Sequence, residues 1–141
     1  MSEFQKSLEI GLKIEEKVLT VLRKKYKSAT IVNAYKGYDI WIPEIHKSVE
    51  VKQDYKSKHT GNIVVEIEMY GKPSGLLSTT ADFWVFSDHE ESFIQMPVRN
   101  IFKCICLNNL KYSEFIGKGD TEPKKAYLIP KEMLFSYGSP L

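Results

Sequence analysis

The sequence predicts one α/β domain over residues 1–141, in which a long N-terminal helix precedes a central mixed β-sheet flanked by helices. Three observations support this fold class. A length of 141 residues suits a single hydrophobic core. Apolar residues make up 43% of the chain, which is enough for a packed interior. Segments with helical and strand periodicity follow one another along the chain, the pattern typical of mixed α/β domains.

The first predicted helix covers residues 3–26, the longest segment with helical periodicity, and it contains no proline. Ser2 immediately before it is a suitable N-cap residue. Placing residues 100° apart gives an apolar stripe that should face the core. The stripe consists of Leu8, Leu12, Leu19, Leu22 and Tyr26. Glu15 falls inside this stripe, whereas Glu16 lies toward its flank.

Short segments rich in β-branched and aromatic residues predict the strands of the sheet. These segments are ATIVNAY (29–35), YDIWIP (38–43), SVEVKQ (48–53), NIVVEIEMY (62–70), ADFWVF (81–86), SFIQM (92–96) and AYLIP (126–130). We expect the segments ADFWVF and SFIQM to form a hairpin. A second helix is expected from Pro97 to about Leu107, where apolar residues again repeat at helical spacing.

Composition excludes several classes of protein. Lys and Arg number 20 against 18 Asp and Glu, so the net charge of +2 is far below that of a polybasic DNA-coating protein. The N-terminus has no apolar signal region and no stretch approaches 18 consecutive apolar residues, so we expect a cytoplasmic protein without a membrane span. The two cysteines and three histidines lack the spacing of a zinc site.

Three acidic residues and one lysine occupy positions where core packing favours apolar side chains. Asp39 begins a strand that continues with three bulky apolar residues. Glu50 and Lys52 alternate with two valines in the next strand, so the acid and the lysine share one face. If the two strands pair, Asp39 and Glu50 converge. Glu15 then reaches the same point, because its apolar stripe must pack on the sheet.

This group of side chains predicts a divalent metal site. Neighbouring carboxylates repel one another and are costly to bury unless a cation neutralises them. Oxygen ligands without thiolate or imidazole suit Mg²⁺ or Mn²⁺. A lysine on the same face can orient water and offset charge on a phosphoryl oxygen, which is the apparatus of phosphodiester hydrolysis. The alternative for Glu50 and Lys52 is an ordinary solvated strand face with an ion pair.

The same residues resemble a known motif. Asp39, then Glu50-Val51-Lys52, with Glu15 upstream in GLKIEEKVL, resembles the PD-(D/E)XK nuclease superfamily, whose restriction-endonuclease-like core has this order of helix, hairpin, EXK strand, connection and further strand. The resemblance covers roughly residues 8–86. Within the superfamily, the chain is similar to small archaeal and phage enzymes of the Holliday-junction-resolvase type. The proline of the motif is absent, since Tyr38 precedes Asp39.

The resemblance implies a role for each residue of the motif. The implied Mg²⁺ ligands are Asp39, Glu50, the backbone carbonyl of Val51 and, through water or a second ion, Glu15. Mn²⁺ is expected to substitute for Mg²⁺. Lys52 would orient or activate the attacking water, and Gln53 would support its positioning. No nucleotide cofactor is expected.

The resemblance further implies a DNA endonuclease that leaves a 5′-phosphate and acts on branched DNA. An exonuclease, a restriction-like nuclease and an inactive DNA-binding module with this fold remain alternatives. Phosphate contacts are expected from lysines near the site. These are Lys47, Lys56, Lys58 and Lys72. A homodimer is expected because one small core offers little DNA-binding surface and symmetric cuts need two sites. If the chain is phage-encoded, its location is the host cytoplasm.

Overall fold

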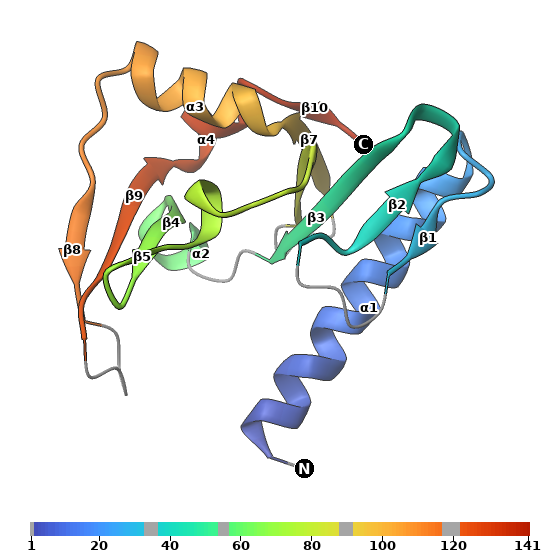
Figure 1. The fold of residues 1–141 in the computed structure, drawn as a ribbon, viewed down its shortest axis with the longest axis horizontal. Coiled ribbons are helices and arrows are strands. Elements are labelled where there is room, and N and C mark those ends of the chain that lie inside the picture. The colour runs from blue at the N-terminus through green and yellow to red at the C-terminus, as the bar shows by residue number, and fades with distance from the viewer. Residues whose placement is uncertain (1, 33–36, 54–56, 88–91, 117–121) are drawn as a thin grey trace.

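The computed structural model of the chain describes residues 2–32, 37–53, 57–87, 92–116 and 122–141 (Figure 1). In chain order its elements, with two short 3-10 helices named η1 and η2, are α1 (Glu3–Arg23), β1 (Thr30–Ile31), β2 (Ile40–Ile42), η1 (Pro43–Ile45), β3 (Lys47–Gln53), α2 (Ser57–Thr60), β4 (Asn62–Met69), β5 (Lys72–Pro73), η2 (Gly75–Leu77), β6 (Phe83–Ser87), β7 (Phe93–Pro97), α3 (Val98–Leu107), β8 (Ser113–Phe115), β9 (Lys124–Pro130), α4 (Lys131–Phe135) and β10 (Ser139–Pro140). The predicted α/β class with a long N-terminal helix is confirmed.

The strands of the described residues form two sheets rather than the one central sheet that the sequence predicted. The larger, mixed sheet has the order β1-β2-β3-β6-β7-β10, with β3 and β6 parallel. The smaller sheet has the order β5-β4-β9-β8. The expectation of one sheet was wrong because β4 pairs with β9, which follows more than fifty residues later, and not with a strand close to it in sequence.

Two clusters of buried side chains hold three layers together (Figure 1). The first cluster joins α1 to one face of the larger sheet and contains Val18, Leu19, Leu22, Ala29, Ile40, Ile42, Val49 and Val85. The second lies on the opposite face, where side chains of β6 and β7 meet β4, β9, α3 and α4. Its largest members are Trp84, Phe86, Met96, Ile101, Ile129 and Leu134. Alternation along β3 therefore directs Val49 toward α1 and Glu50 toward the face that carries Trp84.

Helix α1 begins with a capping box. The Ser2 hydroxyl accepts a hydrogen bond from the Gln5 amide at 3.1 Å, and the Gln5 side chain accepts one from the Ser2 amide at 2.9 Å. These contacts satisfy two of the amides that have no partner within the helix. The N-cap prediction at Ser2 is therefore confirmed.

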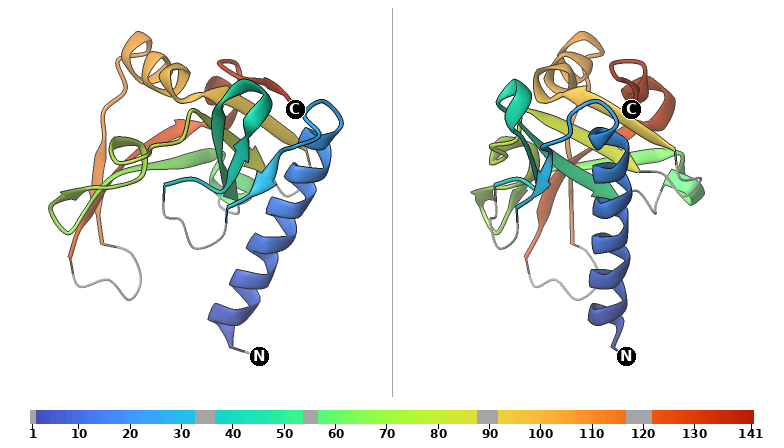
Figure 2. Two further views of the ribbon diagram at one scale, coloured as in Figure 1. Left: turned by 45° about the vertical axis from the view of Figure 1, so that its right-hand side comes forward. Right: turned by 90° about the vertical axis from the view of Figure 1, so that its right-hand side faces the viewer.

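The N-terminal half of α1 extends beyond the strands (Figures 1 and 2). Leu8 is 52% exposed and Leu12 is 46% exposed, so the expectation that both face the core was wrong. The reason is length: 21 helical residues span about 31 Å, whereas the seven residues of β3 span about 23 Å. Only the second half of the apolar stripe, from Val18 to Leu22, finds a surface to pack on.

Other local predictions agree with the structure. The hairpin of β6 and β7 forms with Phe83 opposite Pro97 and Ser87 opposite Phe93. Helix α3 begins at Val98, with Pro97 as its N-cap residue. Among the described residues, no helix is long and apolar enough to cross a membrane.

Candidate active site

Asp39 closes the end of the hydrogen-bonded ladder between β2 and β3. Ile40 pairs with Val49, and the Asp39 amide donates to the Val49 carbonyl at 2.9 Å. Two residues further along β3, the Val51 amide lies beyond the first residue of β2, so no β2 carbonyl is opposite it. It donates instead to Asp39 Oδ2 at 2.7 Å. The Asp39 carboxylate therefore replaces a strand carbonyl, which satisfies a partly buried amide and holds the carboxylate against the end of β3.

Glu15 on α1 meets Asp39 from the helical layer. The pKa of Glu15 is raised from 4.5 to about 7, first by burial, then by the negative charge of Asp39 and by a hydrogen bond between the two carboxyl groups. Near pH 7, Glu15 is therefore about half protonated. Its neighbour Glu16 is exposed. The face of α1 that carries Glu15 is thus the one that approaches the strands, as the helical periodicity predicted.

Gly11 of α1 faces the side chain of Gln53 at the end of β3. A Cβ atom at Gly11 would lie 3.2 Å from Nε2 of Gln53, a tight contact that a small shift of the flexible Gln53 side chain would relieve. Gln53, which was expected to support the site, is therefore packed against the helix one turn before Glu15.

Glu50 and Lys52 lie on the opposite face of β3 and form an ion pair. Lys52 Nζ is 3.2 Å from Glu50 Oε2, with the Lys52 side chain 37% exposed and the Glu50 side chain 18% exposed. The ammonium group also lies 4.6 Å from the ring centroid of Trp84. In the parallel pairing of β3 with β6, Glu50 is opposite Trp84, which puts the indole on the face that carries both side chains. Lys52 is therefore held by a carboxylate and by a cation–π contact.

The Glu50 carboxylate is largely buried and paired with Lys52. Burial raises the pKa of Glu50, Lys52 opposes this shift through its charge and a hydrogen bond, and the charge of Asp39 adds to it. Among the described residues, the contact of the buried oxygen Oε2 is Lys52 Nζ at 3.2 Å.

The three acidic residues and one lysine leave an excess of negative charge at the end of β3. Their carboxylate oxygens are the ligands that Mg²⁺ and Mn²⁺ prefer, so the residue types fit the predicted metal chemically. In the described residues, however, no group of three or more His, Cys, Asp or Glu side chains is arranged to hold a metal ion as it stands. Without metal, the proton between Glu15 and Asp39 relieves the repulsion.

The lysines predicted to contact DNA lie on separate elements. Lys47, at the start of β3, is exposed and lies five residues before Lys52, about 16 Å away along the strand. It does not adjoin the Glu50–Lys52 pair. Lys58 on α2 and Lys72 on β5 are exposed as well. Lys56 lies outside the described residues.

Other acidic residues have structural contacts. Asp82 accepts hydrogen bonds from the amide and hydroxyl of Ser48 at 2.9 and 3.0 Å, and these bonds connect the start of β6 to β3. Glu66 lies 3.8 Å from Lys124, and Glu68 lies 3.5 Å from Lys125, both across the smaller sheet. These acids do not belong to the group formed by Glu15, Asp39 and Glu50.

Sequence reasoning missed two contributions to the site. Trp84 is a core residue with 2% exposure, and its ring also supports Lys52. The two residues come together through the parallel register of β3 and β6, which carries no local signal in sequence. The hydrogen bond from the Val51 amide to the Asp39 carboxylate was also missed, because it depends on the residue at which β2 begins.

Comparison with known proteins adds no relative. No protein-family model matches the chain, and a search of the curated proteins finds no match to its sequence. The chemistry of the site therefore has to be inferred from its own residues.

Proposed function

We propose that the chain is a Mg²⁺-dependent nuclease that hydrolyses phosphodiester bonds in DNA, with Mn²⁺ as a substitute. The observation that carries the proposal is the position of the Asp39 carboxylate at the end of β3, where it acts on Glu15 from α1 and on Glu50 beside Lys52 on the other face of the strand. Burial and the charge of Asp39 raise the pKa of both Glu15 and Glu50. Acids with perturbed pKa values beside a lysine are more typical of a functional site than of a solvated strand face.

The arrangement of the elements supports a restriction-endonuclease-like core. Helix α1, the β2–β3 hairpin and the parallel neighbour β6 follow the order that the superfamily resemblance implies. The connection between β3 and β6 contains β4, β5 and the helical turns α2 and η2. Because β4 and β5 join the smaller sheet, this connection also builds the layer that covers the face bearing Trp84.

Each side chain has a distinct task in the proposed reaction. Asp39 and Glu50 would hold the metal together with the Val51 carbonyl, and Glu15 would contact it through water. When bound, Mg²⁺ supplies Lewis-acid polarisation of the phosphoryl group and an acidified water. Lys52 lies beside Glu50, where its ammonium group can orient water or offset charge on a phosphoryl oxygen. Trp84 limits the positions that this ammonium group can adopt.

We further propose branched DNA as the substrate, a homodimer as the active form and the cytoplasm as its location. Exposed lysines such as Lys58 would contact phosphates without reading sequence. An exonuclease or a restriction-like nuclease would use the same site. A DNA-binding module without turnover is the rival from another class, and one observation favours it: Asp39 and Lys52 already have partners within the protein.

The direct test incubates the purified protein with supercoiled plasmid, a four-way junction, linear duplex and single-stranded DNA. Each substrate is combined with Mg²⁺, Mn²⁺ or EDTA. We expect metal-dependent cleavage, strongest on the four-way junction, and an at least hundredfold loss in a Glu50→Gln variant. A protein that binds these DNAs but cuts none of them in Mg²⁺ or Mn²⁺ would support the binding module instead.

The raised pKa of Glu15 predicts how the stability of the metal-free protein depends on pH. Because the folded-state pKa is about 7 and the ordinary value is 4.5, the folded protein binds this proton more tightly than the unfolded chain does. The resulting stabilisation is fully present below pH 4.5 and is lost as the pH rises through 7. In EDTA, a thermal scan should give a melting temperature that falls by about 3 °C between pH 5.5 and pH 8 through this group.

A Glu15→Gln variant isolates this contribution. Glutamine imitates the protonated acid, so the fall in melting temperature should become smaller, while the shift from Glu50 and other groups persists. Exposed Glu16 supplies the matched control, since Glu16→Gln should leave the pH profile unchanged. Mg²⁺ should raise the melting temperature of the wild type more at pH 8 than at pH 5.5, because binding needs deprotonated acids. Identical profiles for Glu15→Gln and wild type would disprove the assigned pKa.

A further inference from the structure

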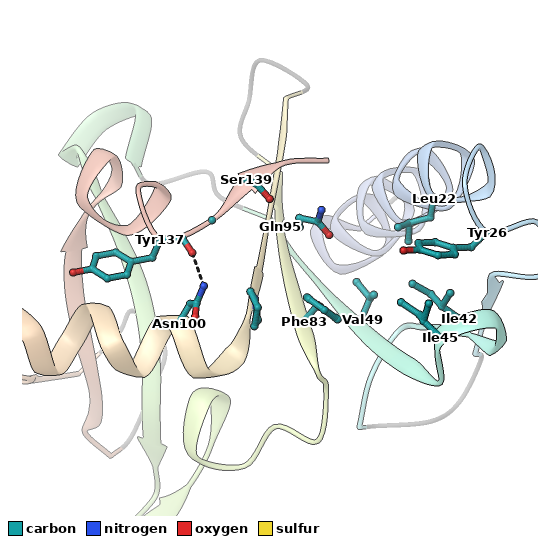
Figure 3. Close-up of a pocket in the computed structure, with 12 residues that line it drawn as sticks. Leu22, Tyr26, Ile42, Ile45, Val49, Phe83, Gln95, Asn100, Tyr137 and Ser139 are labelled. Atoms are coloured by element: carbon teal, nitrogen blue, oxygen red, sulfur yellow. Dashed lines mark hydrogen bonds between the residues drawn. The ribbon is translucent and has the colours of Figure 1, made fainter.

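A cavity lies away from the acidic residues, on the face of the larger sheet that α1 covers (Figure 3). Its volume is about 370 Å³, which is within the range of sites for small molecules. The C-terminal end of α1, the strands β2, β3, β6 and β7, the start of α3 and the turn before β10 all contribute to its wall. Lining residue Leu22 is seven positions beyond Glu15, about 10 Å along the helix, so this cavity is separate from the proposed active site.

One side of the cavity is apolar. Its wall includes Leu22, Ile42, Ile45, Val49 and Phe83. None of the described residues that line the cavity carries a charge. A charged ligand would lose its hydration here without gaining a partner, whereas the face of an uncharged ring would replace water favourably.

Hydrogen-bonding side chains also line the cavity. Figure 3 shows the Tyr26 hydroxyl and the Gln95 carboxamide pointing into the same space, with Ser139 beside Gln95. Among the described residues, none of these three side chains makes a hydrogen bond. Asn100, on the other side of β7 from Gln95 in Figure 3, donates from Nδ2 to the Tyr137 carbonyl at 2.9 Å.

These groups specify the chemistry of a ligand. Carboxamides and hydroxyls offer donors and acceptors close together, and a ligand gains specificity by matching them. A matching molecule has an apolar flat body with alternating donors and acceptors on its edge. Carboxamide side chains recognise nucleobases in this manner, through adjacent donor and acceptor atoms.

We propose that this cavity binds an uncharged, flat heteroaromatic ring of nucleobase type. The ring lies against the apolar wall, and its edge pairs with Gln95 and the hydroxyls of Tyr26 and Ser139. The base can belong to a free nucleoside or to an unpaired residue of a strand. The inference goes beyond the nuclease proposal, because it uses none of the residues assigned to metal or catalysis.

Titration calorimetry on the full chain tests the cavity with adenosine, guanosine, cytidine and thymidine, with their 5′-monophosphates, and with indole as a flat ring that offers a single donor. We expect at least one nucleoside to bind with a Kd below about 1 mM. Its monophosphate should bind no more tightly, since no charged side chain lines the cavity. A Gln95→Leu variant, which keeps the volume and removes the amide, should weaken this binding at least tenfold.

Two further variants keep the outcome interpretable. Tyr26→Phe removes only a hydroxyl and should weaken nucleoside binding if Gln95→Leu fails to fold. Lys52→Met should leave nucleoside binding unchanged, so a failure of the nuclease proposal is separable from a failure of this one. If Gln95→Leu binds a single-stranded oligonucleotide more weakly than the wild type does, the natural ligand is an unpaired base of a strand. If oligonucleotide binding is unchanged, the natural ligand is a free nucleoside. No nucleoside binding at about 5 mM, or indole binding more tightly and unaffected by Gln95→Leu, would overturn the proposal.

Discussion

A Lys52→Met variant should lose at least about a hundredfold of the metal-dependent DNA cleavage rate while remaining folded. Methionine keeps an unbranched apolar stem against Trp84 but removes the ammonium group that lies 3.2 Å from Glu50 and 4.6 Å from the indole ring. The loss follows because a fixed positive charge beside a phosphoryl oxygen stabilises the transition state more than the ground state. Initial rates on the preferred DNA substrate at saturating Mg²⁺ measure the effect.

The smaller sheet contains a matched control for this variant. Lys125 lies 3.5 Å from Glu68 and 5.5 Å from the ring centroid of Tyr112, so it repeats the combination of carboxylate and aromatic partner. A Lys125→Met variant should cleave DNA at a rate close to that of the wild type. If Lys52→Met keeps more than a tenth of the wild-type rate, or if Lys125→Met loses as much, Lys52 has no special place in the reaction.

Two substitutions of Asp39 should separate its structural task from its chemical one. Asp39→Ala removes the acceptor for the Val51 amide, which costs about 1–3 kcal/mol of unfolding free energy, and it also removes a metal ligand. Asp39→Asn keeps an oxygen that can accept this hydrogen bond but lacks the negative charge. Both variants should lose cleavage at least about a hundredfold, and only Asp39→Ala should be substantially destabilised.

Denaturant unfolding in EDTA at pH 8, together with cleavage assays in Mg²⁺, measures both quantities. The pH matters, because at pH 8 Glu15 is largely ionised and the charge of Asp39 repels it. Relief of this repulsion should make Asp39→Asn at least as stable as the wild type. An Asp39→Asn variant that cleaves DNA normally would refute the metal role, and one as unstable as Asp39→Ala would refute the role in the strand ladder.

The site combines features that stabilise the fold with features that strain it. Asp39 completes the ladder of β2 and β3, yet its charge raises the pKa of Glu15 and of Glu50. Asp39, close to Glu15 on one side and to Glu50 on the other, therefore reduces stability near neutral pH unless a proton or a cation compensates. Under the nuclease proposal, this conflict is the reason that the metal would bind, because the cation would replace the shared proton.

Several features of the protein were predictable from the sequence because short-range periodicity determines them. The long helix was expected at residues 3–26 and occupies Glu3–Arg23, since its cap and its apolar repeat are local. The alternation in β3 likewise gave Glu50 and Lys52 a common face without any knowledge of the fold. Glu15 was expected to approach the strands for the same reason, and its contact with Asp39 agrees with that expectation.

Only the tertiary structure decided which distant segments meet. It placed β4 beside β9 in a second sheet, left Leu8 and Leu12 exposed where α1 outruns the strands, and brought Trp84 under Lys52 through the register of β3 and β6. Helix capping and hydrophobic periodicity depend on residues that are close together in the chain, so both can be recognised from the sequence. Pairing between distant strands depends on the total burial that competing arrangements achieve, and no single segment encodes that sum.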